Sequence, residues 1–120
     1  MAKVLIVDDS KFMRLILKNI LGKDGRHSVV GEAENGVDAF NKYKELLPQI
    51  VTMDIIMPIE TGLTAVKKMV EFDKDVKIIM VSAMGQEKIV EEAMQLGAKG
   101  FVVKPVKPEV LLEMIEKVLS

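Results

Sequence analysis

The chain has 120 residues, which suits one compact domain, residues 1–120, whose core needs no covalent cross-link. It contains no cysteine, which excludes disulfides and thiolate metal sites, and its net charge of −1 and 4% aromatic residues argue against nucleic-acid binding. The first residues contain no apolar segment long enough for a signal peptide or a membrane span, so we expect a cytoplasmic protein that does not insert into membranes.

The first strand is predicted over residues 3–7, followed by a helix that Ser10 caps and Asp24-Gly25 ends. Apolar residues recur along this helix at the spacing of a core-facing stripe: Phe12, Met13, Ile16, Leu17, Ile20 and Leu21. Its basic residues fall mainly on the other face: Lys11, Arg14 and Lys18.

The second strand is predicted over residues 28–33, and Asn35-Gly36 then forms a turn. The helix after it ends before Pro48, and its apolar positions are Ala39, Phe40, Tyr43 and Leu47. The third strand covers residues 50–53 and leads into a loop at Met57-Pro58. Thr61 or Gly62 precedes the third helix.

The fourth strand is predicted over residues 76–81, and the helix after it stops at Gly97. The fifth strand covers residues 100–103, and Pro108 sits at the start of the last helix. The apolar runs within these strands are continuous rather than alternating with polar residues, as expected for parallel strands covered on both faces. The pattern therefore predicts an α/β fold, a five-stranded parallel sheet in a (βα)5 three-layer sandwich.

Four of the apolar runs end on a residue suited to phosphate or metal chemistry. The first runs into Asp8-Asp9, the third into Asp54, the fourth into Ser82, and the fifth into Lys104. The carboxyl ends of parallel strands meet at one edge of the sheet, where open α/β folds bind ligands. Three carboxylates and one ammonium leave two negative charges there, which one divalent cation such as Mg²⁺ would cancel.

Each residue taken alone also has a structural interpretation. Asp8 or Asp9 could cap a helix, Asp54 could be a turn acid, Ser82 could be a buried hydroxyl, and Lys104 could be a surface charge. Their joint placement at four strand ends favours chemistry instead. Asp54 can act as a nucleophile that forms an acyl phosphate, while Lys104 and Ser82 contact the phosphoryl group.

These residues resemble the receiver domain of bacterial response regulators. The matching motifs are Val7-Asp8-Asp9-Ser10 with Met13-Arg14, Asp54-Ile55-Ile56-Met57-Pro58 with Gly62, Ser82-Ala83, and Lys104-Pro105. The chain looks most like the stand-alone, CheY-like chemotaxis branch of that family. The resemblance implies the flavodoxin-like strand order 2-1-3-4-5, and a protein that catalyses only its own phosphorylation and dephosphorylation.

The resemblance also implies a role for each site residue. Asp54 would be the phosphoacceptor, with Mg²⁺ held by Asp9, by the backbone carbonyl of Ile56 and, mostly through water, by Asp8. The Lys104-Pro105 bond would be cis. Ser82 would move toward the phosphoryl group and Phe101 would be the aromatic switch residue.

Partners follow from the same resemblance. The phosphoryl donor would be a CheA-like histidine kinase, and the target of the monomer would be the flagellar motor switch protein FliM or a similar protein. The switched surface is predicted to comprise the fourth helix, fifth strand and fifth helix, with these contact residues: Lys88, Lys99, Val103 and Lys107. The alternative for these lysines is that they are ordinary solvated charges.

Two features depart from familiar family patterns. Ile56 and Met84 replace polar residues found near the phosphate in members that dephosphorylate quickly, so we expect slow self-dephosphorylation and possible control by a separate phosphatase. Glu60 replaces the second methionine of the usual Met-Pro-x-Met-x-Gly pattern.

Three other functions remain open on sequence alone. The chain could be a phosphorelay carrier or a regulator outside chemotaxis. It could also be a phosphatase with an aspartate nucleophile, but such enzymes need a second acid two residues later, where this chain has Ile56.

Overall fold

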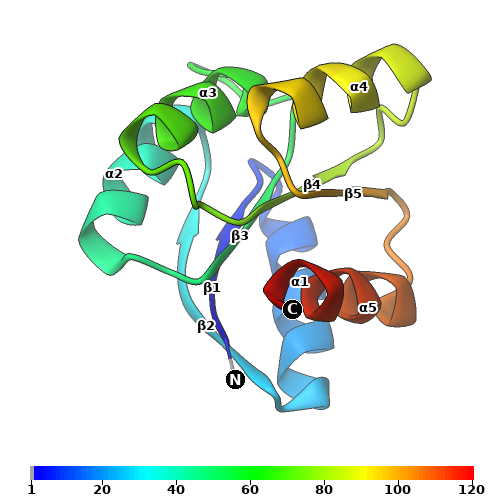
Figure 1. Cartoon of the computed structure of the whole chain (residues 1–120). Helices are drawn as coiled ribbons and strands as arrows, with labels where there is room; N and C mark the ends of the chain where they lie inside the picture. The colour runs from blue at the N-terminus through cyan, green and yellow to red at the C-terminus, as the bar shows by residue number, and fades with distance from the viewer. Residues whose placement is uncertain (1) are drawn as a thin grey trace.

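The computed structural model describes residues 2–120, in which five strands alternate with five helices (Figure 1). The strands are β1 (Ala2–Val7), β2 (His27–Ala33), β3 (Ile50–Met53), β4 (Ile78–Ser82) and β5 (Gly100–Val103). The helices are α1 (Lys11–Asp24), α2 (Gly36–Leu46), α3 (Gly62–Phe72), α4 (Glu87–Leu96) and α5 (Pro108–Leu119). All strand pairs are parallel, in the order β2-β1-β3-β4-β5, which confirms the predicted fold and strand order.

Helices cover both faces of the sheet, α2, α3 and α4 on one side and α1 and α5 on the other (Figure 1). Alternate residues of each strand therefore enter two separate cores. In β1, Leu5 and Val7 pack in the core under α2, α3 and α4, whereas Val4 and Ile6 pack in the core under α1 and α5. This double burial explains why the strand segments that face both cores are mostly apolar rather than alternating.

The predicted helix ends are mostly confirmed. Ser10 caps α1 by accepting a hydrogen bond from the Met13 amide at 3.2 Å, and Gly97 ends α4 with a φ of +117°. Thr61 is the residue that caps α3. Asn35 does not form a separate turn: its side chain caps α2, which begins at Gly36.

Strand limits differ slightly from the sequence prediction. β1 and β2 begin one residue earlier than predicted, and β4 covers Ile78–Ser82 rather than residues 76–81. Differences of this size are normal where strands fray into loops. The extension of β4 matters for the site because it makes Ser82 the last residue of a strand.

Two apolar residues predicted to face the core lie on the surface. Phe12 is 71% exposed and Leu47 is 62% exposed. The buried residues of α1 are Arg14, Leu17, Ile20 and Leu21. Phe12 projects from nearly the opposite side of the helix to the row formed by Arg14, Leu17 and Leu21. Leu47 lies past the end of α2 in a left-handed conformation before Pro48, which turns it away from the sheet.

Candidate functional site

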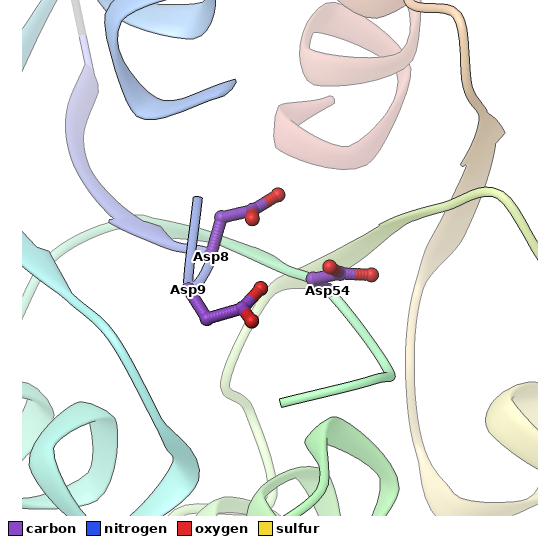
Figure 2. A group of neighbouring side chains, drawn as sticks. All are labelled: Asp8, Asp9 and Asp54. Carbon is purple, nitrogen blue, oxygen red and sulfur yellow. The ribbon is translucent and has the colours of Figure 1, made fainter. Parts of the chain in front are cut away.

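The carboxyl edge of the sheet brings together the polar residues that follow its strands. Asp8 and Asp9 come directly after β1, Asp54 follows β3, and their carboxylates lie close together (Figure 2). Carboxylate oxygens of all three lie within 4.8 Å of one another. Asp8 and Asp54 are nearly inaccessible to solvent, whereas Asp9 is exposed.

Backbone hydrogen bonds that continue the sheet hold the two buried acids. The Asp54 amide donates to the Val7 carbonyl and the Asp8 amide donates to the Ala33 carbonyl, each at 3.0 Å. Their carboxylates accept local bonds as well, Asp8 from the Ser10 amide at 2.9 Å and Asp54 from the Ile55 amide at 2.8 Å. The acids are therefore fixed in place before any ligand is bound.

Lys104, just past β5, supplies the cation of the site. Its Nζ donates to Asp8 Oδ2 at 2.9 Å and to Asp54 Oδ2 at 3.1 Å. The peptide bond between Lys104 and Pro105 is cis. Burial opposes the charge of Lys104, but the hydrogen bond to Asp8 and the charge of Asp54 together raise its pKa above the ordinary value.

Asp54 is held in an environment that disfavours its ionised form. Burial raises the pKa of its carboxyl, the charge of Asp8 adds to the rise, and Lys104 opposes it. One ammonium therefore does not fully compensate the acids around it, and a further cation would stabilise the site.

Ser82 in β4 and Phe101 in β5 lie on the same face of the sheet, the face that α4 covers. Ser82 is buried at the end of β4, and its Oγ accepts a hydrogen bond from the Met84 amide at 3.1 Å. Phe101 pairs with Met80 across β4 and β5 and packs, half-buried, against the core on that face. Since alternate residues share a face, the Ser82 side chain lies on the same face as Met80 and Phe101.

Comparison with known proteins identifies the architecture. Residues 4–116 match the response regulator receiver domain. The chain belongs to this family. The chemotaxis protein CheY of Thermotoga maritima is 53% identical over 116 residues, covering 97% of this chain and 96% of the relative. CheY of Bacillus subtilis is 52% identical over 118 residues, covering 98% of each chain.

The structural comparison agrees. A receiver in the crystal structure of the CheX-CheY-BeF3-Mg²⁺ complex from Borrelia burgdorferi superposes with a TM-score of 0.95 and 38% identity, over 98% of this chain and 89% of that one. The chain is thus a phosphorylation-activated response regulator of the chemotaxis class, as predicted, and the relay, non-chemotaxis and phosphatase alternatives are not favoured. Receivers of this class are signalling proteins.

The acidic cluster of this receiver has the composition of a magnesium site. Receiver domains generally bind Mg²⁺, and the converging ligands here are carboxylate oxygens, which Mg²⁺ prefers. The only histidine of the chain, His27, begins β2 at the opposite edge of the sheet, so imidazole plays no part in the cluster. The net negative charge of the cluster therefore attracts a cation.

The loop between β3 and α3 forms one side of the site. Ile56 is 59% exposed and Ile59 is 82% exposed with a φ of +68°, an unusual conformation for a β-branched residue. Glu60 stabilises the loop: its carboxylate lies 2.8 Å from Lys68 Nζ, and its carbonyl accepts from the Gly36 amide. Glu60 thereby ties this loop to both α2 and α3.

The predicted contact residues do not all lie together. Lys88 near the start of α4, Val103 at the end of β5 and Lys107 before α5 are exposed near the carboxyl edge. Lys99 precedes β5 at the opposite edge, where it lines a hollow of about 560 Å³ with Lys77 and Lys117. Three of the four residues are therefore placed to contact one partner near the site.

Two residues that support the site had no assigned role in the sequence prediction. Arg14 was placed on the solvent face of α1, but only 9% of it is exposed. Gly62 packs so closely on the Asp54 backbone that an added Cβ would lie 1.9 Å from the Asp54 carbonyl oxygen. Both belong to the motifs that carry the family resemblance, which is the signal that could have directed attention to them.

Proposed function

We propose that this receiver carries a chemotaxis signal by accepting a phosphoryl group on Asp54 from a histidine kinase of the CheA type. The observation that supports this most is the Lys104 ammonium, which bridges Asp54 and Asp8 beside a third carboxylate. In this arrangement Asp54 is the nucleophile, with a fixed cation next to the oxygen atoms of the incoming group.

The transfer replaces one bond to phosphorus with another. A carboxylate oxygen of Asp54 attacks the phosphorus atom, and the bond from phosphorus to the histidine nitrogen of the kinase breaks with its electron pair on that nitrogen. Lys104 stays in place and pairs with the charge on the phosphoryl group. Catalysis of this kind depends on positioning and charge neutralisation, which the prearranged side chains provide.

The metal in this proposal is Mg²⁺, held by Asp9, Asp54 and the backbone carbonyl of Ile56, with Asp8 acting mostly through water. When bound, Mg²⁺ supplies positive charge to the phosphoryl oxygens and to the acids. Phosphorylation changes the charge of Asp54 by only about one unit. The output must therefore come from repacking of side chains rather than from the change in total charge.

The switch runs from Ser82 to Phe101. Ser82 gives up its bond to the Met84 amide and donates to the phosphoryl group, and Phe101 then moves into the space that becomes free. Phe101 has no hydroxyl, so its inward position needs no polar partner. The affected surface comprises α4, β5 and α5, including Lys88, Val103 and Lys107, and the proposed target is a flagellar switch protein of the FliM type.

Slow loss of the phosphoryl group is a further part of this proposal. Ile56 and Met84 flank the site and cannot orient an attacking water by hydrogen bonding. A separate phosphatase would then set the lifetime of the signal. We further propose that residues 1–120 act as a single receiver, as a monomer in the cytoplasm, and that the chain catalyses only its own phosphorylation and dephosphorylation. No helix between residues 2 and 120 combines the length and apolar character needed to cross a membrane.

The test is direct phosphorylation. The protein is incubated with acetyl phosphate and Mg²⁺ and its intact mass is measured, with Asp54→Asn as the test variant and Asp75→Asn, at an exposed aspartate, as the matched control. We expect a gain of one phosphoryl group in the parent and in the control, and none in Asp54→Asn. An unmodified parent, or equal modification of Asp54→Asn, contradicts the proposal.

A further inference from the structure

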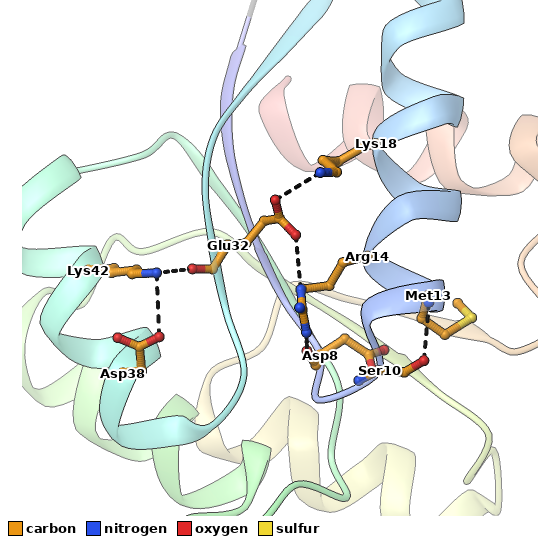
Figure 3. Close-up of polar contacts among 8 residues, drawn as sticks. All are labelled: Asp8, Ser10, Met13, Arg14, Lys18, Glu32, Asp38 and Lys42. Atoms are coloured by element: carbon orange, nitrogen blue, oxygen red, sulfur yellow. Dashed lines mark hydrogen bonds and ion pairs between the residues drawn. The ribbon is translucent and has the colours of Figure 1, made fainter.

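Arg14 is a buried cation that links α1 to the acidic site. Its Nη1 donates to the carbonyl oxygen of Asp8 at 2.7 Å, and its side chain runs from α1 to Asp8 (Figure 3). β1 ends at Val7, so the Asp8 carbonyl lies beyond the strand and is bound by this side chain instead. The guanidinium contacts the backbone of an acidic site residue without touching any of its carboxylates.

The other end of the guanidinium is anchored to β2. Arg14 Nε donates to Glu32 Oε1 at 2.9 Å, and Lys18 Nζ donates to Glu32 Oε2 at the same distance (Figure 3). Lys18 and Arg14 lower the pKa of Glu32, so its carboxylate is charged at neutral pH. The rigid fork of arginine suits this arrangement because two of its nitrogen atoms reach different partners at once.

Asp8 is consequently held from four directions. Its amide donates to Ala33 in β2, its Oδ1 accepts from the Ser10 amide, its Oδ2 accepts from Lys104, and its carbonyl accepts from Arg14. Among these, the Arg14 bond acts on the peptide unit that joins Asp8 to Asp9. It therefore controls the direction in which the chain leaves β1 and where the exposed Asp9 carboxylate lies.

We propose that Arg14 is a positioning residue, which holds the turn at Asp8 and Asp9 in the geometry that binds the divalent cation. This inference rests on the proposed function, because it concerns the same acidic site. Glu32 contributes to this positioning, since it orients the Arg14 guanidinium and balances its charge. Conserving the charge alone is not sufficient, because a lysine ammonium cannot occupy both nitrogen positions of the fork.

The experiment compares Arg14→Met and Arg14→Lys with two matched controls. Lys18→Met removes the other cation bound to Glu32, and Arg26→Met removes an arginine that pairs with Asp24 and Glu116. The dissociation constant for Mg²⁺ alone is measured by calorimetry. We expect it to rise about tenfold or more in Arg14→Met, the usual size of such supporting contacts, less in Arg14→Lys, and to stay within about twofold in the controls.

A second readout needs no metal. Amide exchange of Ser10 is compared with that of Gly25, whose amide bonds to Leu21 at the far end of α1. A loosened turn speeds exchange at Ser10 selectively, whereas a general loss of stability speeds both amides. We expect the selective pattern in Arg14→Met and protection at Ser10 close to the parent's in both controls.

The outcomes separate this inference from the proposed function. Parent-like Mg²⁺ affinity and Ser10 exchange in Arg14→Met overturn the positioning role, even if Asp54 is phosphorylated normally. If Arg14→Met does not fold, the same parent-like result in Arg14→Lys overturns it. A parent that is never phosphorylated on Asp54 defeats the proposed function, but weakened Mg²⁺ binding and selective exchange in the variant would still support the role of Arg14.

Discussion

The close contact between Gly62 and Asp54 offers a sharp test of how the fold positions the site. Gly62 is the first residue of α3, and its amide donates to the Ile55 carbonyl at 2.8 Å. A Cβ at this position would lie 1.9 Å from the Asp54 carbonyl oxygen and 2.8 Å from its carbonyl carbon. Both atoms belong to the backbone, so no side-chain rotation can relieve the overlap.

The size of the effect follows from that distance. Ordinary contacts begin at 3.4 Å, so Gly62→Ala must separate α3 from Asp54 by about 1.5 Å. Overpacking of this kind costs about 1–3 kcal/mol, and we expect the upper end of the range because the backbone must move. A shift of about 1 Å in a reacting group can reduce a rate by about a hundredfold, and phosphorylation from acetyl phosphate should fall by that order.

The assay pairs urea unfolding with the rate of phosphorylation, and Gly22→Ala is the matched control. A Cβ at Gly22, inside α1, would meet nothing within 4 Å, so alanine should stabilise the helix by about 0.5–1 kcal/mol. Parent-like stability in Gly62→Ala would refute the packing argument. Lost stability with an unchanged rate would refute the claim that this contact positions Asp54.

Three further predictions concern charge and water at or near the site. Burial raises the pKa of Asp54 above its ordinary 3.8, so the contribution of Asp54 to stability is lost as the pH rises through the raised pKa. Asp54→Asn should therefore stabilise the metal-free protein at pH 7 by about 1 kcal/mol in urea unfolding. A loss of stability in this variant would contradict the prediction. Lys18 and Arg14 lower the pKa of Glu32 from 4.5, so the stability that Glu32 adds is present above that pH and is lost as the pH falls through the lowered pKa. Glu32→Gln should therefore cost less than about 1 kcal/mol at pH 7 and progressively less as the pH falls below 4.5, and a difference independent of pH would refute this. We expect that loss of the phosphoryl group becomes faster by up to about tenfold in Ile56→Asn and in Met84→Glu, because each new side chain can make one hydrogen bond to the attacking water. If the phosphorylated mass decays at the parent's rate in both variants, the apolar side chains are not the reason for slow hydrolysis.

The sequence predicted the sheet and its polar edge because both depend on local patterns. Strands buried on both faces are near-continuous apolar runs, and a charged residue directly after such a run lies at the edge of the sheet. This reasoning placed Asp8, Asp54, Ser82 and Lys104 correctly at the carboxyl edge of one sheet. The same locality explains the successful prediction of Ser10 and Gly97 as helix ends, since each acts within one turn of its own helix.

Arg14 was misplaced because the features that bury it are not local. Its charge and its distance of four residues from Lys18 suggest the solvent face of α1, although its spacing of three and seven residues from Leu17 and Leu21 places it in their buried row. The partners that bury it are a carbonyl left without a strand partner after β1 and a carboxylate on β2. Only the assembled sheet brings these two groups to one side of the helix.

Phe12 was misplaced in the opposite direction: it was predicted to face the core but lies on the surface. Its apolar side chain fits the expected stripe, yet Arg14 occupies the buried row of α1 and Phe12 projects to solvent. The helix therefore presents an aromatic residue outward only three residues after Asp9, while it places a cation inward. A hydrophobic pattern predicts burial on average, and this helix departs from the average where it supports the site.

Buried Arg14 and partly buried Lys104 have complementary roles at the sheet edge. Lys104 contacts the Asp8 and Asp54 carboxylates, so its ammonium offsets the charge of the acids. Arg14 contacts the acidic site only through the Asp8 carbonyl, and its own charge is balanced by Glu32. Arg14 can therefore fix the geometry without neutralising the acids that must attract a divalent cation. The pKa of Asp54 remains raised in spite of Lys104, chiefly because the carboxyl is buried and also because Asp8 is near, so a further cation would favour its ionised form. A bound cation, or a phosphoryl group that binds together with its counterion, supplies that positive charge. Any ligand that binds only to the folded protein also stabilises the folded protein.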